Sequence, residues 1–253
     1  MYFTTLNDEY GTRPVIQDVL EDGIGYVILH DIAPRHYGAL DAEIVASARM
    51  STTGALKDAE TDKKLIRYLW EHAHLSPFEQ VEIWFRFRAP LFVISQIERH
   101  RTFSYNQESG RYVKLKDEFY IPKASQWRKN DGKQTANKPT HDFDATTSMI
   151  ETVKEGTRKY HELLERGIAK EQARFVLPAY VQYSSVAMKG NLRNFLHFFE
   201  LRAEAHAQYE TRMYAIAMIN LIRNRLPWTF ELWFESLPKE QLQLIENVVC
   251  YKV

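Results

Sequence analysis

Cysteine is nearly absent from this sequence, which contains a single one, Cys250, among 253 residues. One cysteine cannot form an intrachain disulfide or supply a cysteine-rich zinc site. Apolar runs long enough to span a membrane are also lacking. The first residues, MYFTTLNDEYGTRP, include early acidic side chains and no apolar segment of the kind that a secretion signal needs. We therefore expect a soluble, cytoplasmic protein with a reduced thiol.

The chain has no excess of charge of either sign. Lysine plus arginine is 33 and aspartate plus glutamate is 33, which gives a net charge of 0. This balance argues against binding to nucleic acid through bulk charge, but it leaves room for a local basic pocket that holds a small phosphate ligand. The sequence lacks G-x-G-x-x-G and H-E-x-x-H, so a Rossmann site is disfavoured, and His72 and His74 are at most half of a metal site. We expect no metal and no nucleic-acid partner.

What is present is an ordinary globular composition, with 45% hydrophobic and 26% charged residues. The length fits one large domain or two small ones. The polar stretch 123–140 (KASQWRKNDGKQTANKPT) has no periodicity and is the best candidate for a loop. Because the apolar segments on its two sides need each other to form a core, we interpret it as a surface excursion from a single domain spanning 1–253.

Strand-like and helix-like patterns interleave along the chain. The segment Val81–Phe87 (VEIWFRF) is a clear strand, because alternate residues are apolar. Pro90 suits the first turn of a helix and Gly167 suits a helix stop. The strands are few, so the predicted fold is α+β, with a mixed or antiparallel sheet flanked by long helices. The other predicted strands are Gly25–Ile32, Phe119–Ile121 and Tyr180–Met188, and the predicted helices are Asp41–Met50, Ala59–Ala73, Leu91–His100, Asp142–Arg166 and Asn191–Arg225, the last as one helix or two.

The densest polar stretch is Glu98–Tyr112 (ERHRTFSYNQESGRY), which contains Arg99, Arg101, Arg111 and Gly110 among hydroxyl and amide side chains. Arginine binds phosphate and carboxylate through paired hydrogen bonds, and glycine lets a backbone approach a ligand closely. A plainer interpretation is that the cations stabilise the C-terminal end of the preceding helix. The density of donors favours a site for an anionic ligand.

Family motifs support this interpretation. Arg99, His100 and Arg101 are followed, after seven residues, by Ser109. Four more segments occur in a matching order and spacing, from about residue 40 to residue 235. They are Ser47–Ser51 (SARMS), His74–Glu79 (HLSPFE), Ala173–Pro178 (ARFVLP) and Leu201–Gln208 (LRAEAHAQ). Together these segments resemble the signature of the flavin-dependent thymidylate synthases, the ThyX family.

The resemblance implies methylation of dUMP to dTMP. Methylenetetrahydrofolate would supply the carbon, and FAD reduced by NADPH would supply the hydride. In such a mechanism the flavin carries the chemistry and no cysteine nucleophile is needed. Cys250, among the apolar residues VVCYKV, is accordingly interpreted as a small packing residue.

The resemblance also assigns the nucleotide site. Arg99 would lie between nucleotide and flavin, where its charge stabilises electron density on either ring. Because Glu108 is acidic, we expect its backbone N–H to face the phosphate. A nucleophilic Ser109 would need a base, and no partner motif is recognisable, so Ser109 is assigned to binding. The implied catalytic residues are Arg99, Arg174 and Arg202, and the implied dUMP contacts are Gln96, Arg99, Gln107, Glu108, Ser109, Gly110, Arg111, Arg174 and Arg202.

The implied FAD contacts are spread more widely along the chain. Some of them have structural alternatives: Asn191 suits a helix N-cap, Ser76 a turn, and His197 a core position among aromatic residues. The implied FAD contacts are Ser51, His74, Ser76, Glu79, Arg99, His100, Arg101, Thr102, Gln107, Asn191, Arg193, His197 and His206. The resemblance further implies a homotetramer with shared active sites. The alternative function is a non-catalytic nucleotide- or RNA-binding module that uses the Arg99–Arg111 loop.

Overall fold

The computed structural model describes residues 1–9, 11–35, 39–51, 56–130, 138–248 and 251–252. These residues form a seven-stranded sheet in the order β5-β6-β4-β3-β2-β1-β7. Neighbouring strands are antiparallel except β1 and β7, which are parallel. The α+β prediction is therefore confirmed. The strands are β1 (Tyr2–Asp8), β2 (Gly11–Gln17), β3 (Tyr26–Ala33), β4 (Glu82–Pro90), β5 (Ser104–Gln107), β6 (Tyr183–Asn191) and β7 (Tyr251–Lys252).

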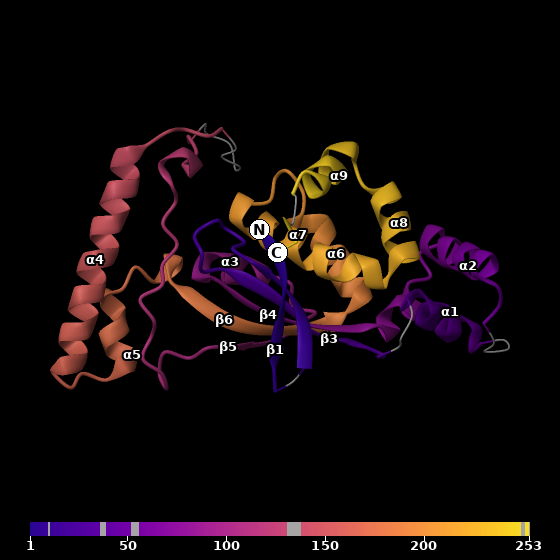
Figure 1. Ribbon diagram of the computed structural model, residues 1–253, viewed down its shortest axis with the longest axis horizontal. Coiled ribbons are helices and arrows are strands. Elements are labelled where there is room, and N and C mark those ends of the chain that lie inside the picture. Colours follow the sequence, from indigo (N-terminus) through magenta and orange to yellow (C-terminus); the bar gives the residue numbers. More distant parts are fainter. Residues whose placement is uncertain (10, 36–38, 52–55, 131–137, 249–250, 253) are drawn as a thin grey trace.

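Helices cover one face of this sheet and extend beyond both of its ends. In Figure 1, α3, α6 and α7 lie over the sheet, α1 and α2 lie at one end, and α4 and α5 lie at the other. The described helices are α1 (Asp41–Arg49), α2 (Ala59–Glu71), α3 (Leu91–Ile97), α4 (Phe143–Glu165), α5 (Lys170–Ala173), α6 (Leu192–Arg202), α7 (Tyr209–Ile222), α8 (Pro227–Ser236) and α9 (Lys239–Glu246). None of them is long and apolar enough to cross a membrane.

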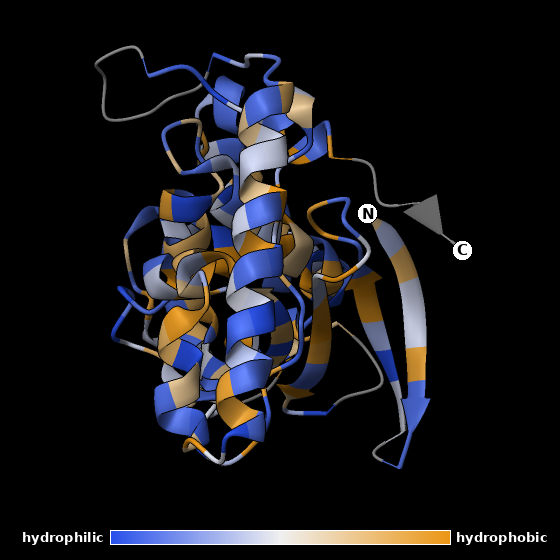
Figure 2. Ribbon diagram, turned by 90° about the vertical axis from the view of Figure 1, so that its left-hand side faces the viewer, coloured by the Kyte–Doolittle hydropathy of each residue, from blue (hydrophilic) through white to orange (hydrophobic). Residues whose placement is uncertain are grey.

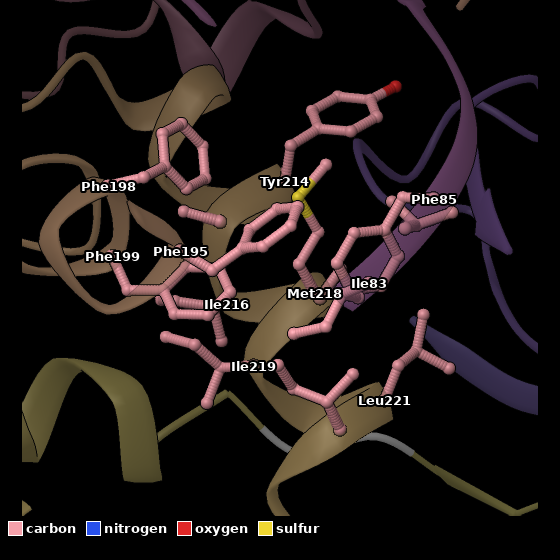
Figure 3. Close-up of a cluster of buried hydrophobic side chains, with 14 of the residues drawn as sticks. Ile83, Phe85, Phe195, Phe198, Phe199, Tyr214, Ile216, Met218, Ile219 and Leu221 are labelled. Carbon is pink, nitrogen blue, oxygen red and sulfur yellow. The ribbon is translucent and has the colours of Figure 1, made fainter. Parts of the chain in front are cut away.

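The main core lies between the sheet and helices α6 and α7. Ile83, Phe85 and Phe87 of β4 are buried, as the alternation in the sequence predicts, while Arg86 faces out. The rings of Phe85 and Phe195 meet edge to face, with centroids 5.3 Å apart. Figure 3 shows α7 inserting side chains among those of α6 and β4. Because α7 is apolar on nearly every side, it has to be enclosed in this way.

Helix α4 packs against the rest of the chain through a second, smaller core. Only Gly156 and Tyr160 of α4 are buried, and its outer face is largely hydrophilic (Figure 2). Tyr160 packs with Phe119, Ala173 and Leu177. A Cβ at Gly156 would lie 2.9 Å from the carbonyl oxygen of Val176, so the glycine lets the chain after α5 approach α4 closely. This contact fixes the segment that carries Arg174.

The predicted elements differ from the observed ones at their ends. The helix expected over Leu91–His100 ends at Ile97, and the region Asn191–Arg225 divides into α6 and α7. Pro90 is the N-cap of α3, and Gly167 has the positive φ of 77° that a helix stop favours. Phe119 forms only an isolated bridge to Gln182.

Some predicted features lie outside the described residues. Cys250 is one of them, so its packing role stays a prediction. Within the polar excursion, residues 131–137 are likewise outside. Its described parts include the short 3₁₀ helix η2 (Ala124–Gln126) and a bridge between Arg128 and Pro139.

Candidate active site

The Glu98–Tyr112 stretch is partly a strand, although its polarity suggested a loop. After α3 ends, the chain turns through Arg99–Thr102 and then forms β5, which pairs with β6 at the sheet edge. Buried Phe103 anchors the turn, with its ring centroid 4.6 Å from that of Phe195. Residues from Gln107 onward therefore start from a fixed edge strand.

A cavity of about 680 Å³ lies where β5 ends, and we call it the Arg174 cavity. Five residues predicted to contact dUMP line it, although they come from two distant parts of the sequence. The remaining lining residues are apolar or polar side chains from α3, the loop after β5, the chain after α5, and β6. The five are Gln107, Glu108, Ser109, Gly110 and Arg174.

Gly110 makes room for a protein side chain in this structure. A Cβ there would lie 3.1 Å from Leu115 Cδ2 and 3.2 Å from Arg174 Nη1. The Arg174 guanidinium therefore lies directly against the Gly110 backbone. Its Nε–H donates to the Glu171 carbonyl oxygen at 3.3 Å. Glycine at position 110 therefore leaves room for the Leu115 and Arg174 side chains, besides the close approach of a ligand that the sequence predicts.

Arg111 lies outside the lining of this cavity. Its Nε–H donates to Glu171 Oε2 at 2.7 Å, and both side chains are exposed. Its guanidinium also lies 5.9 Å from the centroid of the Tyr112 ring. A phosphate contact at Arg111 would have to share the guanidinium with Glu171.

Arg88, which sequence reasoning missed, is a buried residue beneath this loop. Its Nη1 donates to Glu108 Oε2 at 3.0 Å and to Ser185 Oγ at 2.8 Å, and its Nε donates to Glu118 Oε2 at 2.6 Å. Arg88 is 5% exposed. A buried arginine that contacts two carboxylates fixes both of the segments that carry them. The only signal in the sequence is that Arg88 stands between apolar Phe87 and Ala89 near the end of the predicted strand.

Both polar groups of Glu108 already have protein partners. The carboxylate pairs with Arg88, and the backbone N–H donates to the Ser185 carbonyl oxygen at 2.9 Å. The expectation that this N–H faces a phosphate is therefore wrong for this structure, because β6 occupies it. The neighbouring Gln107 is held in a similar way, since its Nε2 donates to Ser184 Oγ at 3.1 Å.

Gln96 lies on α3 and does not line the Arg174 cavity. Its side-chain amide donates to Gln208, and Thr211 Oγ1 donates to Gln96 Oε1 at 2.8 Å. Gln208 is the last residue of the predicted LRAEAHAQ segment. The structure thus brings a predicted dUMP contact and one predicted motif together at the start of α7.

A second group of predicted residues gathers around His100. The Nε–H of Arg202 donates to His100 Nε2 at 2.9 Å, and the His197 ring lies 6.4 Å away, centroid to centroid. Burial, followed by the charge of Arg202, lowers the pKa of His100 to about 4. His100 is therefore neutral at pH 7 and accepts the bond from Arg202. Burial also lowers the pKa of Arg202.

A second cavity, of about 390 Å³, lies next to this group, and we call it the Arg193 cavity. Arg193 and His197 line it together with apolar side chains such as Trp70 and Trp233. Arg193 Nη1 donates to Glu79 Oε1 at 2.5 Å, so two predicted FAD contacts from distant motifs meet here.

Two further predicted FAD contacts have backbone roles in this region. Asn191 is the N-cap of α6, because its Oδ1 accepts from Asn194 N at 3.0 Å. The structural alternative for Asn191 is thus confirmed. Thr102 is linked to the same helix, since its carbonyl oxygen accepts from Asn194 Nδ2 at 3.4 Å.

The remaining predicted residues are more isolated. Arg99 and Arg101 are exposed and make no ion pair with the described residues. Ser51 Oγ donates to the Ala48 carbonyl oxygen, and Ser76 begins the short 3₁₀ helix η1 (Ser76–Gln80). His206 is exposed on the turn between α6 and α7. These positions lie outside the linings of both cavities.

His72 and His74 are not placed to form a metal site with other residues of the described chain. His72 stacks on Tyr68 with ring centroids 4.1 Å apart, and the ring centroids of His72 and His74 are 6.2 Å apart. Across the described ranges, no group of three or more histidine, cysteine, aspartate or glutamate residues is placed to hold a metal ion.

Residues 35–228 match the family model described as thymidylate synthase complementing protein. The chain is 40% identical over 223 residues to a flavin-dependent thymidylate synthase of Thermosipho africanus, and the match covers 86% of this chain and 94% of that protein. It is also 40% identical over 197 residues to the flavin-dependent thymidylate synthase of Thermus thermophilus, covering 78% of this chain and 73% of that protein.

Among solved structures, the chain is similar to the UMP/dUMP methylase PolB from Streptomyces cacaoi bound with 5-Br dUMP. The TM-score is 0.72 at 32% identity, and the match covers 86% of this chain and 97% of that one. The predicted resemblance is therefore confirmed over most of the length. The ordered motifs, the fold and the identities agree that this chain is an enzyme of the flavin-dependent thymidylate synthase family.

Proposed function

We propose that this chain methylates dUMP to dTMP, with methylenetetrahydrofolate as carbon donor and FAD reduced by NADPH as hydride source. The observation that supports this most is the Arg174 cavity. There, the loop after β5 and the chain after α5 meet around about 680 Å³ with amide, hydroxyl and guanidinium donors. Such donors suit the phosphate and sugar of a nucleotide.

In this proposal Arg174 and the loop Gln107–Gly110 bind the nucleotide. Ser109 Oγ accepts from the backbone N–H of Arg111 at 3.3 Å. Among the described residues, no histidine or carboxylate is hydrogen-bonded to Ser109 Oγ, and a serine nucleophile needs such a base. Ser109 therefore binds rather than attacks. Arg88 holds the loop in place through Glu108, so part of the ordering entropy is lost before the nucleotide arrives.

The residues around the turn Arg99–Thr102 fit a cofactor with a pyrophosphate and a planar ring. Arg99 and Arg101 are exposed cations without a described carboxylate partner, and Arg193 lies beside the second cavity. Neutral His100 orients Arg202, whose other guanidinium N–H groups stay available to charge that develops on a ring. When bound, FAD would supply the hydride.

The isolated predicted residues motivate a proposal about assembly. Ser51, His74 and His206 are exposed in the single chain, outside both cavities. We infer that a second copy brings its own residues to them, in a homotetramer of single-domain chains. Light scattering checks the assembly, and an active monomer would contradict it.

The test is dTMP formation by the purified chain with dUMP, methylenetetrahydrofolate, FAD and NADPH, with each component omitted in turn. We expect turnover only when all four are present, and an oxidised-flavin spectrum that shifts when dUMP is added. A parallel reaction with UMP tests sugar selectivity, because the structural relative is a UMP/dUMP methylase. A chain that binds neither FAD nor dUMP would overturn the proposal.

A further inference from the structure

A third cavity, of about 260 Å³, lies between the polar excursion and the first turn of α7. We call it the Arg212 cavity. It is smaller than a site for a drug-sized ligand, and it shares no lining residue with the other two cavities. None of the residues predicted to bind FAD or dUMP lines it. Its lining is Ser125, Gln126, Arg128, Pro139, Tyr209 and Arg212.

Hydrogen bonds fix the wall of this cavity on the side of the excursion. Lys129 N donates to the Lys138 carbonyl oxygen at 2.9 Å, and Thr140 N donates to the Trp127 carbonyl oxygen at 2.7 Å. The Trp127 indole N–H donates to Thr146 Oγ1 on α4 at 2.8 Å. The segment that the sequence left without a role is thus tied to α4 and faces α7.

Arg212, one of the two cations of the cavity, forms no ion pair with the described residues. Arg212 donates to the carbonyl oxygens of Glu204 and Ala205, at 3.3 and 3.1 Å, and pairs with no carboxylate in the described residues. It also lies in the first turn of α7, where the helix dipole disfavours a cation. Burial lowers the pKa of Arg212; the charge of Arg128 adds to this, while Tyr209 and Glu210 oppose it. An anion in the cavity would relieve each of these costs.

The charges around the cavity are mostly positive. Arg128 is a second cation on its wall, and its Nη2 donates to both oxygens of Glu210, at 2.8 and 2.9 Å. Glu210 itself does not line the cavity. Lys129 and Lys138 belong to the same wall segment, and Lys123 lies at its start, 3.6 Å from Glu21. The two guanidinium groups lie 5.9 and 5.8 Å from the centroid of the Tyr209 ring.

We propose that the Arg212 cavity binds a phosphate monoester, with its oxygens held by Arg128 and Arg212. Two guanidinium groups and a helix N-terminus match a doubly charged tetrahedral anion better than a carboxylate. The phosphate is either free or part of a nucleotide, and both sources present the same group.

Hydrogen bonds link the cavity to Gln96, a predicted dUMP contact that lies outside the Arg174 cavity. Glu210, held by Arg128, accepts from Gln208 Nε2 at 3.0 Å, and Gln208 in turn accepts from Gln96. A phosphate that draws Arg128 away from Glu210 would therefore act on Gln96, a predicted dUMP contact. This coupling rests on the proposed function, whereas phosphate binding itself does not.

The first experiment is calorimetric titration of inorganic phosphate into the FAD-loaded chain carrying Arg174→Ala, which weakens phosphate binding in the Arg174 cavity. We expect saturable binding that Arg212→Gln weakens by about tenfold or more, as expected for the loss of a charge-assisted hydrogen bond. Lys138→Gln is the matched control, because it removes one positive charge from the neighbouring wall segment and does not change the cavity lining. Equal weakening by both changes, or no saturable binding, would overturn the proposal.

A second probe distinguishes the source of the phosphate. Titration with 2′,5′-ADP, which carries a 2′-phosphate, is compared with inorganic phosphate. Tighter binding of the nucleotide that Arg212→Gln abolishes identifies a nucleotide phosphate, and equal binding identifies free phosphate. Arg212→Gln is expected to leave the unfolding temperature nearly unchanged, which separates lost binding from lost folding. Nucleotide binding that is unaffected by Arg212→Gln counts against the site.

The coupling is tested by measuring the dUMP dissociation constant with and without phosphate, in otherwise wild-type protein and in Arg212→Gln. Direct competition of phosphate with dUMP in the Arg174 cavity affects both proteins equally. We therefore expect phosphate to change the dUMP dissociation constant more in the wild type than in the variant. Identical changes in the two proteins would overturn the coupling. If dUMP does not bind at all, the proposed function fails while the phosphate titration still decides this inference.

Discussion

Two parts of the proposed active site differ in how firmly the protein holds them. The loop that lines the Arg174 cavity is tied down by buried Arg88, by the Glu108 backbone bond to β6 and by the bond from Gln107 to Ser184. In the turn Arg99–Thr102, buried Phe103 and the bond from Asn194 to Thr102 hold the backbone. The side chains of Arg99 and Arg101 are exposed cations that form no ion pair with the described residues. The first part is built before a ligand binds, whereas the second presents loose donors.

This difference has a consequence for binding. A loop already fixed by protein contacts loses little entropy when a ligand arrives, whereas exposed arginines lose side-chain freedom on binding. Substitution of the residues that hold the nucleotide cavity should therefore reduce both stability and dUMP binding. Substitution of the arginines in the turn Arg99–Thr102 should leave stability nearly unchanged and lower mainly the affinity for the cofactor.

The largest expected effect comes from Arg88→Met. The change leaves Glu108 and Glu118 without their shared partner, and breaking a buried ion pair costs about 3 kcal/mol or more. We expect a loss of about that size in the free energy of unfolding, measured with urea, and weaker dUMP binding. Adding Glu108→Gln should recover part of the stability.

Arg158→Met is the matched control for that prediction. Arg158 also contacts two carboxylates, those of Glu155 and Glu162, but all three side chains are exposed on α4. Its loss should change stability little, because solvent screens exposed ion pairs. Equal effects of the two substitutions would show that burial of Arg88 is unimportant.

The next effect distinguishes the nucleotide cavity from the cofactor region, because each should lose affinity for a different ligand. Arg174→Ala should weaken dUMP binding by about 1.5–3 kcal/mol, the value of a charge-assisted hydrogen bond, and leave the FAD content unchanged. Arg193→Ala, beside the Arg193 cavity, should lower the FAD content and leave dUMP binding unchanged. Calorimetry with dUMP and flavin absorbance measure the two responses. If either variant loses both ligands, the two parts form one cooperative unit and the comparison fails.

A smaller effect is expected for the cap of α6. Asn191→Ala removes the acceptor for Asn194 N and should cost about 1 kcal/mol of stability. Asn191→Ser keeps a capping oxygen and should be close to the wild type in stability. The FAD affinity of the serine variant tests the predicted cofactor contact of Asn191. This affinity should fall only if the Asn191 amide itself contacts FAD.

The smallest effect is a dependence of stability on pH. The pKa of His100 is lowered from 6.5 to about 4, so between these values the unfolded chain binds a proton that the folded chain does not. Stability should therefore fall as the pH drops from 6.5 toward 4. His100→Asn, which cannot titrate, should show a shallower loss in the same window. Unfolding temperatures measured across the window check this, and parallel curves would contradict it.

Much of the fold could be predicted from local patterns. The alternation in β4 and the caps at Asn191 and Gly167 are local signals, and the structure confirms them. Strands β1, β2 and β5 and helices α8 and α9 were missed. β5 is a polar edge strand whose exposure removes the alternation on which such a prediction depends.

Part of the predicted residue set gathers in space, but its supports were not predicted. Gln107–Gly110 and Arg174, which the family resemblance implied as dUMP contacts, line one cavity, and their role stays a prediction. Arg88, Ser184 and Gln208 were missed, since each acts only through a partner that is distant in the sequence. The free N–H expected at Glu108 was wrong because β6 pairs with that residue.

The sequence by itself determined the family, the α+β class and the identity of the donors, because these depend on motifs and periodicities that a single segment carries. Only the tertiary structure decided which donors are held and which are free. That division depends on burial and on partners from other segments. Arg88 pairs with Glu108 and Glu118, whereas Arg212 donates to backbone carbonyl oxygens and forms no ion pair with the described residues. Pairing across the fold is a property of distances in space, and no single stretch of the chain contains it.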